Sequence, residues 1–198
     1  VTCDNGISAK AAIDKAKEYG MTVVVTDHHS VTEEVFPDSA DACVNPRMNS
    51  NSYPFPDICG ALVAFKLLCA LFEGDSRFDE IKEELLEFAA IATVTDVMPL
   101  ISENRRLVKW VLKRLHNPLN KGLLSLVKET KVSEKSTNVT CSDIGFQIGP
   151  CINATGRIDV ADRAVDLFLE DDEKTIEEIT RELIGLNEER KELTEKCV

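Results

Sequence analysis

The run from Met21 to Ser30 constrains this chain more than any other stretch. It contains five consecutive β-branched residues, Thr22 to Thr26, with no alternation of polar and apolar side chains. A strand that is buried on both faces of a parallel sheet has this composition. The run then ends abruptly in Asp27, His28 and His29. Because open α/β sheets bind ligands at the carboxyl ends of their strands, we expect these side chains to form part of a site.

The simpler alternative is a strand followed by a polar loop, in which Asp27 caps a turn. Two of the three histidines of the chain, however, stand side by side behind this acid. Imidazole is both a common metal ligand and the side chain that titrates nearest to neutral pH. A functional site is therefore the preferred interpretation of the Asp-His-His sequence.

A helix is predicted between this strand and an earlier one. Ser8 is a suitable N-cap, apolar residues follow it at helical spacing, and Gly20 is a typical stop signal. A first strand that ends at Cys3, this helix and the strand Thr22 to Thr26 then form a βαβ unit, which is right-handed by strong preference.

Asp4 leaves the first strand at the edge of the sheet where His28 leaves the second. Neighbouring strands lie about 5 Å apart, so the Asp4 carboxylate is within reach of the imidazole. An acid and a histidine in this arrangement predict a metal site. Asp4-Asn5-Gly6 is also good turn chemistry, so the prediction depends on what lies beside it.

The next segments read as one strand and two helices. Ala42 to Val44 is a short third strand, and Gly60 to Phe72 is a helix so apolar that we expect it to be buried on most sides. The segment Phe78 to Thr95 begins as an acidic amphipathic helix and becomes apolar, and Asp96 follows it directly. Taken alone, Asp96 is better explained as a turn former than as a further carboxylate of the site.

The second half reads mainly as helices, with one interruption. Two glycines and a proline predict a structured loop from Ile148 to Arg157. Helices are predicted for Glu103 to Leu115, after Pro118, from about Ser142, for Ala161 to Leu169 and for Lys174 to Lys196. The predicted fold class is α/β, with a Rossmann-like parallel sheet, a mostly helical part and a long C-terminal connecting helix.

The net charge of −12 argues against nonspecific nucleic-acid binding by the whole surface. A stretch from Asn104 to Lys121 carries only basic charges, and it is either a local contact surface or the solvated face of a helix. The seven cysteines are scattered singly, which predicts reduced thiols and a cytoplasmic location. No signal sequence or membrane span is apparent.

Five motifs occur in a fixed order along the chain. They are Cys-Asp-Asn-Gly-Ile-Ser, Val-Thr-Asp-His-His, Gly-Ala-Leu-Val-Ala-Phe-Lys, Ala-Thr-Val-Thr-Asp-Val-Met-Pro-Leu and Ile-Asn-Ala-Thr-Gly-Arg. Together they resemble the DHH phosphoesterase superfamily and, within it, the RecJ-type single-stranded-DNA-specific exonucleases. Asp-His-His alone marks only the superfamily, whereas the order and spacing of all five motifs make the resemblance specific to the RecJ type.

The resemblance implies metal-dependent phosphodiester hydrolysis, with 5′-to-3′ digestion of single-stranded DNA in recombination and repair. It assigns metal ligation to Asp4, His28 and Asp96, which reverses the interpretation of Asp96 as a turn former. It places His29 at the scissile phosphate, and Asp27 is expected to orient an imidazole. The expected catalytic residues are therefore His28, His29 and Asp27.

The resemblance also implies a substrate contact from Arg157, through the phosphate or the nucleotide, with Asn153 in the same segment. Carboxylates and imidazole suit two divalent cations, Mn²⁺ or Mg²⁺, about 4 Å apart, which would activate water and stabilise the attacking and leaving oxygens. The alternative interpretation of Arg157 is an ion pair with Asp159 or Asp162. The expected partners are single-stranded DNA and a single-stranded-DNA-binding protein or a helicase.

The resemblance suggests three parts. Residues 1–100 would form the DHH domain without its first strand and Asp-x-Asp motif, residues 101–170 its helical remainder, and residues 171–198 a helix toward a missing DHHA1 domain. We therefore expect a fragment of a catalytic core that is inactive alone. The alternatives are a DHH phosphodiesterase acting on nanoRNA or cyclic dinucleotides, and a non-catalytic replication scaffold. The scaffold is disfavoured because all three expected ligands are present.

Overall fold

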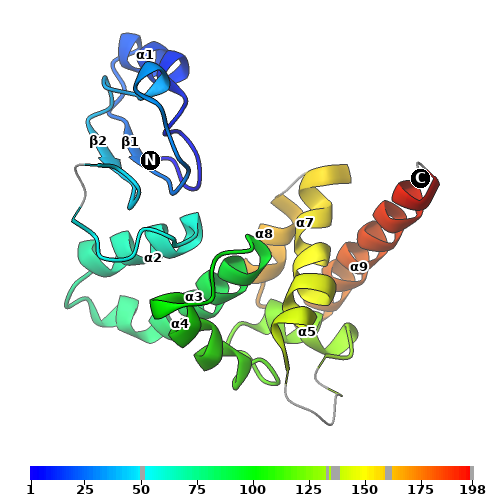
Figure 1. Ribbon diagram of the computed structural model, residues 1–198. Coiled ribbons are helices and arrows are strands. Elements are labelled where there is room, and N and C mark those ends of the chain that lie inside the picture. The colour runs from blue at the N-terminus through cyan, green and yellow to red at the C-terminus, as the bar shows by residue number, and fades with distance from the viewer. Residues whose placement is uncertain (50–51, 133, 135–138, 159–161, 197–198) are drawn as a thin grey trace. The chain divides into compact units, whose positions relative to one another are not determined.

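The computed structural model describes residues 1–49, 52–132, 134, 139–158 and 162–196 (Figure 1). The chain divides into two compact units, Val1–Leu107, called unit 1 here, and Val108–Val198, called unit 2. Unit 1 contains the parallel strands together with helices, and unit 2 consists of helices in its described part. The predicted α/β class with a mostly helical remainder is therefore confirmed.

The sheet of unit 1 pairs β1 (Val24–Thr26) with β2 (Ala42–Val44) in parallel, with Val25 opposite Cys43. The predicted first strand is not a regular strand. Its backbone nevertheless runs along β1, because the N–H of Thr2 donates to the carbonyl of Val24 (2.9 Å) and the N–H of Asp4 to that of Thr26 (3.0 Å).

Strand β1 is shorter than predicted, because Val23 bonds to Asp41 ahead of it. The N–H of Val23 donates to the Asp41 carboxylate (2.7 Å), and its carbonyl accepts from the Asp41 N–H (2.9 Å). The apolar side chains beside β1 form a small core of Ile7, Ile13, Val23 and Val25.

Helix α1 (Lys10–Glu18) covers this core with Ile13. The prediction that Ser8 is its N-cap is wrong: Ala9 occupies that position without a side-chain bond. A turn precedes the helix, in which the N–H of Ala9 donates to the carbonyl of Gly6 (3.0 Å), so Ser8 lies inside this turn and before the cap position. Gly20 follows the helix with a φ of 74°, as the stop signal predicted.

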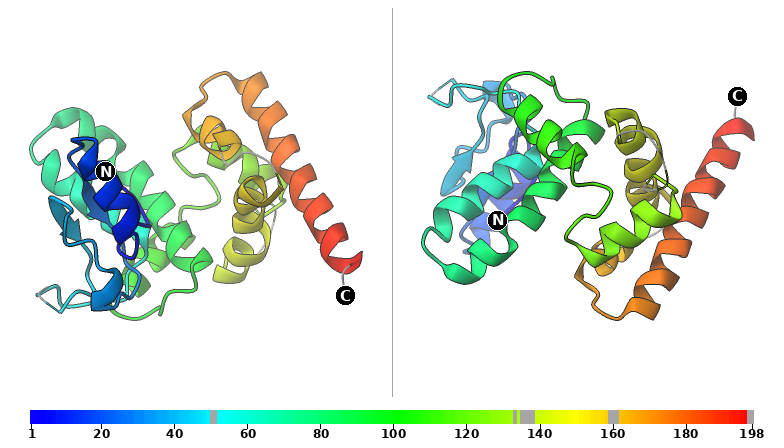
Figure 2. Two further views of the ribbon diagram at one scale, coloured as in Figure 1. Left: turned by 90° about the horizontal axis from the view of Figure 1, so that it is seen from above. Right: turned by 90° about the horizontal axis from the view of Figure 1, so that it is seen from below.

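Helices α2 (Gly60–Leu71) and α3 (Ser76–Thr95) pack side by side (Figure 2). The expectation that α2 is buried on most sides holds only for its first turn, because Leu71 at its end is 65% exposed. Helix α2 also contacts the sheet through β1. A short 3₁₀ helix, η1 (Glu33–Val35), lies between the strands, and α4 (Ser102–Leu112) follows α3.

Unit 2 is built around the long helix α9 (Glu173–Lys196), which packs against α5 (Lys121–Glu129), α7 (Gly149–Ile158) and α8 (Asp162–Leu169). A short α6 (Cys141–Asp143) and a π-helical segment, η2 (Ile144–Ile148), lead into α7. Helices α5 and α8 approach closely at Gly122, where a Cβ atom would lie 2.1 Å from the carbonyl oxygen of Leu167.

The predicted loop from Ile148 to Arg157 is wrong, since α7 occupies this segment. Pro150 lacks an N–H, and it directly follows a π-helical segment in which the N–H of Gly149 donates to the carbonyl of Ile144. The π-helical segment η2 runs directly into α7, so Gly149 continues a helix rather than ending one. Proline and glycine therefore lie within a continuous run of helical residues here.

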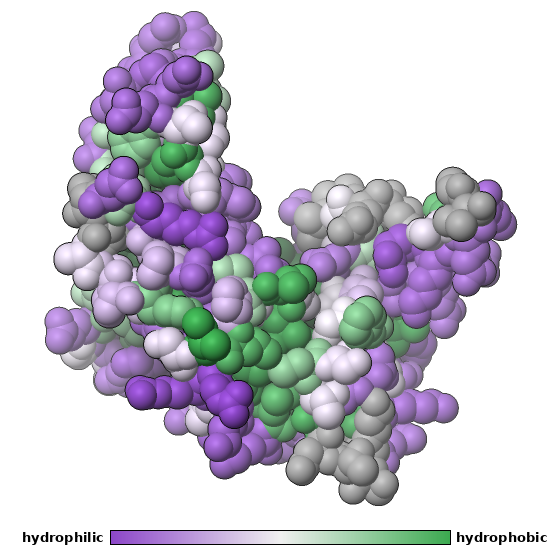
Figure 3. Space-filling model, in the orientation of Figure 1, coloured by the Kyte–Doolittle hydropathy of each residue, from purple (hydrophilic) through white to green (hydrophobic). Residues whose placement is uncertain are grey.

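The apolar stripe of α9 is buried only along its first half. Ile176, Ile179 and Leu183 are buried, whereas Leu193 is 48% exposed. The surface over the last turns of this helix is hydrophilic (Figure 3). Within the described ranges, none of the helices has both the length and the apolar character that a membrane crossing requires.

Candidate metal centre

A buried imidazole lies between two carboxylates in unit 1. Nε2 of His28 is 3.1 Å from Oδ1 of Asp4 and 3.4 Å from Oδ2 of Asp96. His28 leaves the end of β1, Asp4 leaves the segment beside it, and Asp96 is the C-cap residue of α3. The structure thus brings together three residues that are far apart in the sequence.

The His28 ring fits a ligand role. This residue is only 5% exposed, and neither of its ring nitrogens has a hydrogen-bond partner within the described part of the chain. A buried polar group without a partner is costly, so it calls for a specific explanation. An imidazole nitrogen facing two carboxylates is a donor set that suits a divalent cation.

Asp27 holds the loop that presents both histidines. Its Oδ1 accepts from the N–H groups of His28 (2.7 Å) and His29 (3.2 Å) and lies 2.7 Å from Nδ1 of His29. Its Oδ2 accepts from the N–H of Ile7 (3.0 Å). Burial alone would raise the pKa of Asp27, but these hydrogen bonds outweigh burial and place the pKa below its ordinary value.

His29 is a further donor to the cluster. Asp4, His28 and His29 each offer one ligand atom, and these three atoms lie within 4.8 Å of one another. Asp27 occupies Nδ1 of His29 and raises the pKa of this imidazole, which leaves Nε2 for a ligand or a phosphate. Two adjacent histidines after one strand indicated in the sequence that His29 belongs to the site. The sequence did not indicate that the centres of the two rings would lie 4.4 Å apart.

Two residues at the centre have unusual backbone conformations. Asp4 has a φ of 60°, and Val97, which follows Asp96, has a φ of 55°. This region is sparsely populated by residues other than glycine and is especially unfavourable for a β-branched residue. Burial raises the pKa of Asp4, while His28 opposes this effect and Asp96 adds to it. Strain and a crowded carboxylate together are typical of a functional site.

Asn104 fixes the segments beside the centre, a role that sequence analysis missed. It is fully buried, and its Nδ2 donates to the carbonyls of Asp57 (2.7 Å) and Pro99 (3.0 Å). Asp57 precedes α2, and Pro99 follows Asp96, so Asn104 links these two segments. The preceding residue, Glu103, adds an ion pair with Lys66 (2.9 Å).

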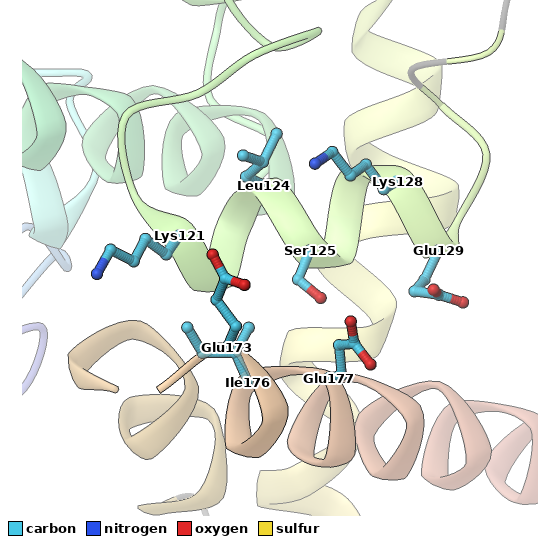
Figure 4. Close-up of a pocket in the computed structure, with 8 residues that line it drawn as sticks. All are labelled: Lys121, Leu124, Ser125, Lys128, Glu129, Glu173, Ile176 and Glu177. Atoms are coloured by element: carbon cyan, nitrogen blue, oxygen red, sulfur yellow. The ribbon is translucent and has the colours of Figure 1, made fainter. Parts of the chain in front are cut away.

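The expected substrate residues lie on α7 in unit 2. Asn153 is exposed beside a groove of about 530 Å³ formed with α8. Arg157 continues the backbone of α7, and its side chain lies outside the described residues. A second groove of unit 2, between α5 and α9, has a volume of about 310 Å³ (Figure 4). Lysines and glutamates line it together, and Lys121 is already paired with Asp171 (2.7 Å).

Known proteins similar to this chain fall into one family and one kind of exonuclease. Residues 1–93 match the DHH family, N-terminal domain. The chain is 39% identical to the single-stranded-DNA-specific exonuclease RecJ of Bacillus subtilis (strain 168), over 99% of its own length and 24% of that protein. It is 34% identical to the RecJ of Escherichia coli (strain K12), over 98% of its own length and 34% of that protein.

Solved structures give the same result. The crystal structure of exonuclease RecJ bound to manganese matches with a TM-score of 0.81 and 32% identity, over 99% of this chain and 48% of that chain. The crystal structure of RecJ in complex with Mn²⁺ from Thermus thermophilus also matches with a TM-score of 0.81 and 32% identity, over 99% of this chain and 28% of that one.

The match to the DHH family, N-terminal domain, is confined to residues 1–93. Over nearly its full length it is similar to the RecJ exonucleases of that family, as its motifs predicted. It spans about a quarter of the Bacillus subtilis protein and a third of the Escherichia coli protein.

Proposed function

We propose that this chain is the central part of a metal-dependent exonuclease that digests single-stranded DNA from the 5′ end in recombination and repair. The observation that carries the proposal is the buried His28 between Asp4 and Asp96. It is supported by similarity to RecJ exonucleases over 98–99% of the chain.

In this proposal, Asp4, His28 and Asp96 hold divalent cations, Mn²⁺ or Mg²⁺. Bound cations would activate a water molecule and stabilise negative charge on the phosphate oxygens. Asp27 fixes the orientation and tautomer of His29 through the Nδ1 contact. The His29 side chain is 59% exposed, and in this proposal its Nε2 would face the scissile phosphate.

Because the chain spans only part of its relatives, we propose that residues outside it complete the centre and much of the DNA-binding surface. Residues 1–100 and 101–170 would then be parts of one DHH domain, and residues 171–198 would lead to the next domain. Further partners would be a single-stranded-DNA-binding protein or a helicase. The cysteines of the described residues are all free, which supports a cytoplasmic location.

The test is a nuclease assay on the full-length protein. With Mn²⁺ or Mg²⁺, we expect release of mononucleotides from the 5′ end of single-stranded DNA, no digestion of blunt duplex DNA, and no release when a chelator removes the metal. Hydrolysis of short RNA or cyclic dinucleotides with no action on single-stranded DNA would contradict the proposal.

Arg157→Lys is expected to weaken binding of single-stranded DNA by about tenfold, because lysine cannot reproduce the two parallel hydrogen bonds of a guanidinium on a phosphate. The melting temperature should change little. The measurement is DNA affinity by fluorescence anisotropy beside a thermal melt, on the full-length protein.

Arg163→Lys is the matched control, because Arg163 on α8 pairs with Glu182 (2.6 Å) within unit 2. This control should affect stability more than DNA affinity. If Arg157→Lys instead lowers stability and leaves the affinity unchanged, Arg157 is a structural residue, and the metal centre is not affected by that result.

A further inference from the structure

We propose that Gly60 is a positioning residue of the metal centre, because the side chain it lacks leaves the space that the Asp4 carboxylate occupies. The inference rests on the proposed function of this centre. It assigns a role to the first residue of the Gly-Ala-Leu-Val-Ala-Phe-Lys motif, to which the sequence analysis gave none.

The steric argument is direct. A Cβ atom at Gly60 would lie 2.3 Å from Oδ1, 2.5 Å from Cγ and 2.6 Å from Cβ of Asp4. These separations are far below the roughly 3.5 to 4 Å of a favourable contact. Rotation of the Asp4 side chain would move its carboxylate but not its Cβ atom. Any residue other than glycine therefore forces a movement of the backbone.

The backbone of Asp4 has little freedom to move. Its N–H donates to the carbonyl of Thr26 in β1 (3.0 Å), and its φ of 60° is sparsely populated. A shift of Asp4 away from Gly60 would also change the 3.1 Å separation between its carboxylate and His28.

The start of α2 is held equally firmly. Cys59, the residue before Gly60, is buried, and its Sγ contacts Thr93 Oγ1 (3.4 Å) and the carbonyl of Ala89 (3.8 Å) in α3. Helix α3 ends at Asp96, so a displacement of α2 would be passed toward the second carboxylate of the centre. Both ways of accommodating a side chain at Gly60 therefore disturb the ligands.

Backbone conformation does not explain this glycine. Its φ lies outside the left-handed region, and Gly60 is the first residue of a regular helix. Alanine is the better helix former, so helix propensity alone predicts that Gly60→Ala stabilises the protein. The proposed role predicts the opposite sign, which makes the substitution informative.

The test uses the full-length enzyme with Gly60→Ala and, as matched control, Gly185→Ala. Gly185 lies within α9, and a Cβ there would meet nothing within 4 Å. We expect Gly60→Ala to weaken Mn²⁺ binding at least tenfold, measured by electron paramagnetic resonance of the free ion, and to lower the melting temperature in the presence of a chelator. Gly185→Ala should keep the Mn²⁺ affinity and melt at the same or a higher temperature.

A double-mutant cycle covers the case in which Gly60→Ala does not fold stably. Asp4→Gly removes the three atoms nearest to the added Cβ, so adding Gly60→Ala to Asp4→Gly should cost little or raise the melting temperature. A similar loss of stability with and without the Asp4 side chain would overturn the proposal, as would wild-type Mn²⁺ affinity in Gly60→Ala. If the unaltered enzyme fails to bind Mn²⁺, the proposed function is contradicted instead, and the melting cycle still decides whether Gly60 and Asp4 share this space.

Discussion

Asp4→Ala or His28→Ala in the full-length enzyme is expected to lower hydrolysis of single-stranded DNA about 10³-fold, which corresponds to about 4 kcal/mol of lost transition-state stabilisation. Loss of a ligand removes a cation from the centre. The fold should persist, because neither ring nitrogen of His28 holds a described hydrogen bond and the side chain of Asp4 is half exposed.

The measurement is metal-dependent release of mononucleotides, taken beside a thermal melt of each variant. Asp38→Ala is the matched control, since Asp38 is a carboxylate of the same unit that pairs with Lys10 and is 71% exposed. It should keep the wild-type rate. Wild-type rates in Asp4→Ala and His28→Ala as well would remove the metal assignment.

Asp27→Ala is expected to lower the free energy of unfolding by about 3–5 kcal/mol, the range for a buried charged partner that leaves polar groups unsatisfied. Asp27 is only 1% exposed, and its carboxylate accepts from the backbone N–H groups of Ile7, His28 and His29. Alanine would leave all three donors without their acceptor. The loop that carries both histidines would lose its order together with that stability.

Urea denaturation of the full-length protein measures this effect, and Asp27→Asn refines it. Asparagine retains one oxygen acceptor, so it should destabilise less than alanine. It removes the negative charge beside Nδ1 of His29 and should therefore still reduce hydrolysis. A variant with alanine at this position and unchanged stability would show that the loop does not depend on the carboxylate.

The parts of the centre that could be predicted are those with a local signal. Asp27, His28 and His29 stand out because a buried strand cannot continue into them, and Asp96 directly follows an apolar helix. The convergence of Asp4 and His28 followed from the parallel arrangement of neighbouring strand ends. That Asp96 faces the same imidazole could not be derived from its own segment, and only the family resemblance indicated it.

The remaining features depend on residues that are distant in the sequence. The role of Gly60 is visible only when Asp4 is placed beside it. The role of Asn104 is visible only from the two carbonyls that accept its hydrogen bonds. The segment Ile148 to Arg157 was assigned to a loop because proline and glycine usually interrupt helices. Their effect depends on position within the helix, which the sequence pattern alone does not give.

The metal centre of unit 1 combines residues that are translated at different times. Asp4 and His28 are synthesised before α2 and α3, whereas Asp96 is added only after both helices. Contacts of such long sequence separation form slowly, and a nascent chain exposes apolar surface until they close. Helix α2 contacts β1, so a chain that stalls before residue 60 leaves that part of the sheet uncovered and exposed to chaperones or to other unfinished chains.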